Sequence, residues 1–219
     1  MEAFRIRREE EMAKLREMNG REKAGYIWEY YKIPIIVFVV LVFIIASLVN
    51  NILNPPKKPY LGIALMGGYM DEEAAKTFTG SISDAIIPED EKELFEVQMN
   101  FFFFNEEDPQ MLMAYQQKFM AMLATNELDV LIIEGEELPG YAEQEIISDL
   151  RATFGGNELS GYGDYVAYVD GAPFGIRLDG NNFLAASNLR GDGLMLTVVI
   201  NSNKTDEVKA AVRCIMSGN

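Results

Sequence analysis

The chain has 219 residues, with 34 acidic against 19 basic residues, a net charge of −15, no histidine and one cysteine. A disulfide within the chain is therefore excluded, and a zinc site is disfavoured because its usual ligands are missing. After Pro59 the chain carries 27 acidic and nine basic residues, a net charge of −18, so we expect no nucleic acid partner.

Residues 33–53 form an apolar segment whose centre, Ile35 to Val49, contains no charge. Its length of about 20 residues suffices to cross a hydrocarbon core of roughly 30 Å. A cleaved signal peptide would have a shorter apolar core, and a helix buried in a soluble domain would keep a polar stripe. We therefore predict one transmembrane helix over residues 33–53, in contact with the lipid bilayer. Pro34 would lie in its first turn, where a missing amide costs little.

The flanks of this segment indicate its orientation. Residues 1–32 hold eight basic and seven acidic residues, whereas only Lys57 and Lys58 follow the segment closely. An excess of bases before the helix favours a cytoplasmic head over residues 1–32. Aromatic residues of the kind found at headgroup level precede the helix, namely Tyr26, Trp28, Tyr30 and Tyr31. We expect residues 54–59 to form a proline-rich spacer and residues 60–219 to form an extracytoplasmic domain at the cell membrane.

The first half of this domain alternates apolar runs with helical patterns. We expect strands over residues 60–66, 95–104 and 128–133, and the second, apolar on both faces, predicts a central buried strand. Asp71 is a good cap for a helix that Pro88 ends, with Ala74, Ala75, Phe78, Ile82, Ala85 and Ile86 on one face. The next helix places on one face Leu112, Tyr115, Phe119, Met122 and Leu123. This alternation predicts a parallel sheet covered by helices.

The second half is less regular. Residues 138–150 suggest short helices broken at Gly140. Two strand-like pieces, 165–169 and 174–178, are joined through Asp170 and Gly171, a strong hairpin signal. A buried strand over 194–200 and a closing helix over 206–216 follow, with Cys214 as a small core residue. We therefore predict a three-layer α/β domain with a mainly parallel sheet and an antiparallel hairpin.

The order of these pieces resembles a known family. The segments AYQQKFMAMLATNELDVLIIEGEEL, ISDL, VDGAPFGIRL and LTVVINSNKTDEVKAAVRCI are similar to one lobe of an extracytoplasmic solute-binding protein of the periplasmic type II fold. The resemblance covers Tyr60 to Met216 and implies a single lobe, whereas a complete member encloses its ligand between two. The head and anchor, with WEYYK before the helix, also look like small single-pass membrane proteins of Gram-positive bacteria whose role is uncharacterised.

No pattern in the chain names a reaction. The G-x-S-x-G elbow and the P-loop are absent. Carboxylates cluster at residues 89–91, 106–108 and 136–137, but each cluster falls in a polar stretch typical of a solvated surface. We therefore expect a non-catalytic protein without cofactor or metal.

The ends of the first three predicted strands give a candidate binding site. Gly67, Gly68 and Tyr69 follow the first strand, Asn105 the second, and Glu134 the third. The carboxyl ends of parallel strands meet at one edge, where α/β folds bind ligands, although glycines in such a turn also serve the backbone alone. Two functions remain open. One is a membrane-tethered interaction or accessory domain that binds a protein of the membrane or envelope. The other is a lobe that senses or captures a small solute for a transporter.

Overall fold

A computed structural model describes residues 19–53, 55–104, 108–186, 189 and 193–217. The chain separates into two compact units, residues 1–56 and residues 57–219. Residues 1–18 of the predicted head lie outside the described residues, as does Asn105.

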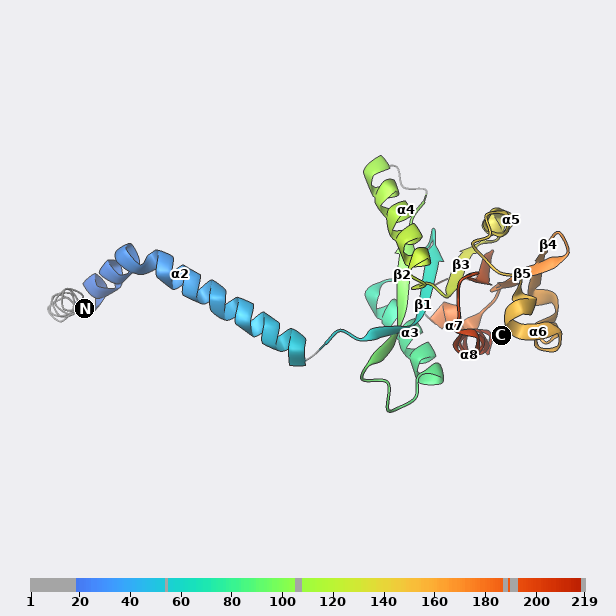
Figure 1. Cartoon of the computed structure of the whole chain (residues 1–219), viewed down its shortest axis with the longest axis horizontal. Coiled ribbons are helices and arrows are strands. Elements are labelled where there is room, and N and C mark those ends of the chain that lie inside the picture. Colours follow the sequence, from blue (N-terminus) through green and yellow to red (C-terminus); the bar gives the residue numbers. More distant parts are fainter. Residues whose placement is uncertain (1–18, 54, 105–107, 187–188, 190–192, 218–219) are drawn as a thin grey trace. The chain divides into compact units, whose positions relative to one another are not determined.

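The described part of the first unit contains the long helix α2, which runs from Gly20 to Leu53. Its portion from Lys32 to Leu53 has a mean hydropathy of 2.9, so it is long and apolar enough to cross a membrane. The prediction for Pro34 was wrong, because the helix begins well before the apolar segment and Pro34 lies in its interior. A proline there removes one hydrogen bond and favours a bend, and Figure 1 shows α2 bending in its N-terminal part.

The second unit is built on a sheet whose six described strands lie in the order β2-β1-β3-β6-β5-β4. Their bounds are β1 Lys58–Met66, β2 Phe95–Phe102, β3 Val130–Glu134, β4 Val166–Val169, β5 Ala172–Arg177 and β6 Leu194–Val198. β1 pairs parallel with β2 and β3, whereas β6 runs antiparallel to both β3 and β5. Four of the six strands therefore point the same way. The predicted α/β class with an antiparallel hairpin is confirmed.

The hairpin joins β4 to β5 through the two residues predicted for its turn. Asp170 and Gly171 both have positive φ, +50° and +79°. That is the backbone a two-residue hairpin turn requires, and Asp-Gly adopts it readily.

Two strand predictions need correction. β2 is an edge strand and not a central one, because among the described strands it pairs with β1 alone. The first strand begins at Lys58, so Lys58 and Pro59 belong to β1 and not to the predicted spacer. In both cases the local sequence did not specify which strand would lie alongside.

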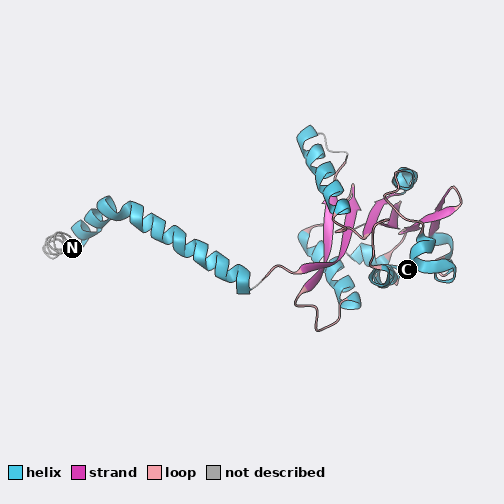
Figure 2. Cartoon of the chain, in the orientation of Figure 1, coloured by secondary structure: helices cyan, strands magenta, loops and turns pink. Residues whose placement is uncertain are grey.

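Helices cover both faces of the sheet, as Figure 2 shows. We call the face under α3, α6, α7 and α8 the covered face; these helices span Glu72–Ile86, Leu150–Ser160, Asn182–Ala186 and Thr205–Met216. We call the other the open face; it carries α4, Pro109–Ala124, and α5, Leu138–Glu143, which follows the short helix η1, Gly135–Glu137. Alternate residues of each strand supply the two cores. Leu61 and Ile63 of β1, for example, lie in the first core, and Ala64 in the second.

The helix predictions hold in part. The Asp71 side chain accepts a hydrogen bond from the Ala74 amide at 2.8 Å and caps α3, as predicted. Ala85, which was predicted on the apolar face of this helix, is exposed. Helix α5 runs through Gly140 without the predicted break. Helices α6 and α7 are not predicted from the sequence. Helix α6 contains two glycines, and one of them, Gly155, has a φ of +69° and kinks the helix.

One buried carboxylate fixes the amino end of β3. Asp129 is 1% exposed and accepts hydrogen bonds from the Gly62 amide at 2.9 Å and the Ser202 hydroxyl at 2.8 Å. Lys204 Nζ lies 3.0 Å from its Oδ2 atom. A Cβ at Gly62 would sit 1.8 Å from the carbonyl oxygen of Glu127, so only glycine allows the backbones to approach this closely.

Candidate functional site

The predicted site residues lie where the carboxyl ends of β1 and β3 meet. Gly67 directly follows β1 and has a φ of +71°, and its amide donates to the Phe102 carbonyl at 2.8 Å. A Cβ on Gly67 would lie 3.6 Å from Oε1 of Glu134. The structure therefore brings Gly67 and Glu134 together. A Cβ on Gly68 would meet the Leu65 side chain at 3.0 Å.

Tyr69 turns toward the neighbouring strand. Its ring centroid lies 5.8 Å from that of Phe101, and its side chain is 66% exposed. Asn105 lies outside the described residues. A shared pocket for all five predicted residues therefore stays a prediction.

The topology explains why this edge is special. The chain leaves β1 for α3 on the covered face, and it leaves β3 for η1 and α5 on the open face. Adjacent parallel strands whose connections depart to opposite faces leave a crevice between them at their carboxyl ends. Gly67 and Glu134 stand at this switch point.

Immediately beyond Glu134, a groove of about 580 Å³ opens on the open face between α4 and α5. We call it the α4–α5 groove. Its α4 side is formed by Gln116, Phe119 and Met120, with Phe104 after β2. Its other side is formed by Glu136, Glu137, Gly140, Tyr141, Gln144 and Ile146. The groove is thus aromatic and aliphatic inside, with carboxylates and amides at its margin.

Helix α4 leaves much of its apolar surface uncovered. Only Phe119 and Met122 are buried, both in its second half, and the first half extends beyond the strand ends in Figure 1. Met113 and Met120 are 60% and 61% exposed, and Met111 is also exposed. Methionine is flexible and polarizable, and it is common on surfaces that adapt to partners.

The groove contains two titratable groups whose pKa values are shifted. Glu137 is exposed, but partial loss of its hydration, reinforced by the charge of Glu134, raises its pKa, although a hydrogen bond from the Glu134 backbone partly opposes this. Burial raises the pKa of Tyr141 as well, with the Glu137 charge as the second cause. A cation placed beside Glu137 would relieve the repulsion between the two carboxylates.

These residues favour binding over chemistry. Tyr141 stays protonated at neutral pH, and its hydroxyl can donate or accept hydrogen bonds. The exposed Glu134, Glu136 and Glu137 can accept hydrogen bonds or pair with bases. Within the described ranges, no group of three or more His, Cys, Asp and Glu side chains is placed to hold a metal ion.

Most of the groove is not predicted from the sequence. Phe119 is buried, as predicted for its helix face, and residues 136–137 are exposed, as predicted for a solvated surface. Neither these residues nor Met120 and Tyr141 are predicted as site residues. One signal was present. Helix α4 contains four of the chain's 12 methionines, and three of them lie off the buried face.

Several solved structures are similar to part of this chain. An extracellular solute-binding protein of family 1 from Alicyclobacillus acidocaldarius is 21% identical, with 56% of this chain and 29% of that chain covered and a TM-score of 0.36. A cyclic alpha-maltosyl-1,6-maltose binding protein from Arthrobacter globiformis is 16% identical, with coverage of 74% and 39% and a TM-score of 0.35. An ABC transporter solute binding protein from Agrobacterium vitis S4, with bound D-mannitol, is 18% identical, with coverage of 52% and 26% and a TM-score of 0.32.

The chain therefore spans between 26% and 39% of the length of these proteins. No protein-family profile matches it, and no curated protein sequence matches it.

Proposed function

We propose that the chain is a membrane-tethered, non-catalytic interaction domain that binds a partner protein through the α4–α5 groove. The observation that carries this proposal is the groove itself, a largely apolar hollow with a volume of about 580 Å³ that stays open between two helices. A large apolar surface rimmed by polar groups marks an interaction site in a soluble domain. The exposed methionines of α4 extend this surface beyond the groove.

The chemistry of the groove suggests the partner. Phe104, Phe119 and Tyr141 offer apolar contacts, whereas Glu136 and Glu137 stand at the margin. The region after Pro59 carries a net charge of −18, so a basic partner is attracted at long range. A basic, amphipathic segment of another membrane or envelope protein meets both requirements, because its apolar side would fill the groove and its bases would pair with the carboxylates.

The proposal includes the anchor and its orientation. Residues 33–53 would lie in the bilayer, residues 1–32 in the cytoplasm, and the domain after Pro59 outside the cell membrane. Protease added to cells stripped of their wall should digest the region after Pro59 and spare the head. Protection of the region after Pro59 would contradict this topology.

Site-specific crosslinking in native membranes tests the groove. A photoreactive amino acid at Met120 should give one discrete crosslinked product, and Glu137→Lys should abolish it by repelling a basic partner. The same amino acid at Asp206, exposed on α8 of the covered face, is the matched control and should give no product. Equal products at both positions, or none at Met120, would contradict the proposal.

A second function is favoured by the proximity of Gly67 and Glu134 at the switch point. A small polar solute bound there would make the chain a sensing or solute-capturing lobe associated with a transporter. Neighbouring permease genes would favour this reading, and neighbouring secretion or envelope genes would favour the interaction domain.

A further inference from the structure

The outer edge of β2 is an open sheet edge with a groove beside it. β2 pairs only with β1 in the described sheet. A groove of about 340 Å³ runs between this strand and α3. The helix contributes Glu72, Ala75, Lys76 and Thr79, and the strand contributes residues 96–100. We call it the α3–β2 groove; it shares no lining residue with the α4–α5 groove.

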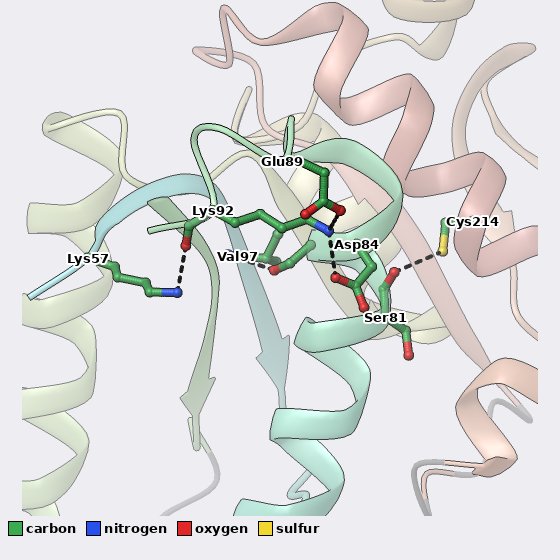
Figure 3. Close-up of polar contacts among 8 residues, drawn as sticks. Lys57, Ser81, Asp84, Glu89, Lys92, Val97 and Cys214 are labelled. Atoms are coloured by element: carbon green, nitrogen blue, oxygen red, sulfur yellow. Dashed lines mark hydrogen bonds and ion pairs between the residues drawn. The ribbon is translucent and has the colours of Figure 1, made fainter. Parts of the chain in front are cut away.

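The hydrogen bonds of β2 show which backbone groups face outward. The carbonyls of Leu94 and Phe102 accept from β1 and from Gly67, which directly follows it, each at 2.8 Å, so even-numbered residues point toward β1. The Val97 amide instead donates to Ser83 Oγ of α3 at 3.2 Å. Figure 3 shows Val97 at this position beside α3.

Because backbone groups alternate in direction along a strand, Met99 and Phe101 face the same side of β2 as Val97, away from β1. Their amides and carbonyls therefore point outward. Within the described part of the chain, neither amide meets an acceptor outside the sheet. The α3–β2 groove thus presents unpaired main-chain donors and acceptors along one wall.

Natural edge strands usually prevent strand addition with lysine, proline or a bulge. β2 reads FEVQMNFF, with one charge and no proline, and the irregularity in its pairing with β1 lies in β1, between Pro59 and Leu61, opposite Glu96 and Val97. The end at Met99 and Phe101 is regular and unprotected.

We propose that the α3–β2 groove binds an extended, basic segment of a partner protein, which adds to the sheet as a seventh strand beside β2. Unpaired amides and carbonyls in a row are complemented by another strand, and the pocket alongside selects its side chains. The charges favour a basic segment, because Lys76 and Glu72 are paired with one another at 2.6 Å and Glu96 then leaves the lining of the groove with a net charge of −1. The region after Pro59, with a net charge of −18, attracts a basic segment at long range. A second copy of the chain would bring another strongly acidic domain to this edge.

A synthetic peptide of alternating valine, threonine and lysine is the probe, and its counterpart with glutamate for lysine is the control. Fluorescence anisotropy with the full chain in neutral-lipid nanodiscs should show binding of the lysine peptide, with the glutamate peptide about tenfold weaker or worse. Amide exchange at Met99 and Phe101 should slow when the lysine peptide binds. Failure of the lysine peptide to bind would overturn the proposal.

Main-chain pairing has its own controls. Met99→Pro removes an outward amide and is tolerated at an edge position, so it should weaken binding about tenfold or more, whereas Met99→Val should not. N-methylation of alternate peptide residues should abolish binding in one phase and spare it in the other, a result that needs no change in the protein. Equal binding of both N-methylated peptides would overturn the proposal.

Light scattering on the same samples tests whether a second copy of the chain pairs with the edge of β2. A dimer that forms without peptide and that Met99→Pro breaks would mean that the edge pairs with a second copy, which would also overturn the proposal. Glu137→Lys changes the α4–α5 groove and leaves the α3–β2 groove intact. The peptide-binding and light-scattering results therefore do not depend on the function proposed for the α4–α5 groove.

Discussion

The two faces of the sheet differ in how completely helices cover them. On the covered face, four helices enclose a core of 25 described buried residues. On the open face, two helices enclose 12, and the α4–α5 groove separates them. The same strands serve both faces, so the difference comes from the helices alone.

Because of this difference, we expect the covered face to supply most of the stability and the open face to supply the binding surface. Free energy of folding comes mainly from burial of apolar area, and the covered face supplies more of it. The open face keeps Met113 and Met120 in water, an arrangement that is unfavourable unless a partner covers them. We therefore expect substitutions on the covered face to lower the free energy of unfolding, and substitutions in the groove of the open face to weaken partner binding instead.

The largest expected effect is on the covered face. Phe78 is fully buried and its ring lies 5.3 Å from that of Phe183, so Phe78→Ala should lower the free energy of unfolding by about 3–5 kcal/mol. Met120→Ala on the groove wall should change it by less than about 0.5 kcal/mol. Urea unfolding of the two variants measures both. Equal losses would mean that the groove wall is core and not a binding surface.

The second effect concerns the carboxylate at the amino end of β3, a strand that both faces share. Lys204→Met leaves Asp129 buried without its cation, and we expect a loss of about 2–3 kcal/mol, somewhat below a fully buried pair because Lys204 is partly in water. Lys76→Met, which breaks a fully exposed pair with Glu72, should cause no measurable change. If Lys204→Met proved neutral, the Ser202 and Gly62 hydrogen bonds would be sufficient to hold Asp129.

The two faces also differ in how far they could be predicted from the sequence. The helix on the covered face from Asp71 to Pro88 was anticipated, because its cap, its apolar period and its terminator are all local signals. The edge position of β2 was not, because an apolar run such as Phe101 to Phe104 reports burial of side chains and does not specify which strand lies beside it. The α4–α5 groove depends on how far α4 and α5 stand apart, which only tertiary packing decides.

A smaller effect should appear in the titration of Glu137. Its pKa should lie above the ordinary glutamate value of about 4.3, and Glu134→Gln should remove only part of the shift because partial loss of hydration is the larger cause. The raised pKa makes folding weaken as pH rises from the ordinary value through the raised one, since the folded state binds the proton more tightly than the unfolded state. NMR titration of Glu137 checks the shift, and Glu137→Gln should remove this residue's contribution to the change in stability over that interval.

The smallest effect we expect is from small molecules. A ligand that binds only the folded chain raises stability by RT ln(1 + [L]/Kd), but a site open on one side buries less of its ligand than the roughly 70–90% typical of enclosed pockets. Gly67 and Glu134 lie at an edge, and Glu134 is exposed, so affinity there should be weak unless another chain covers the site. A thermal-shift screen of sugars, amino acids, peptides and anions on the full chain should therefore give no shift beyond a few degrees. One compound with a large shift that Glu134→Ala or Asn105→Ala abolishes would favour solute capture at the strand ends, and the α4–α5 groove would then be secondary.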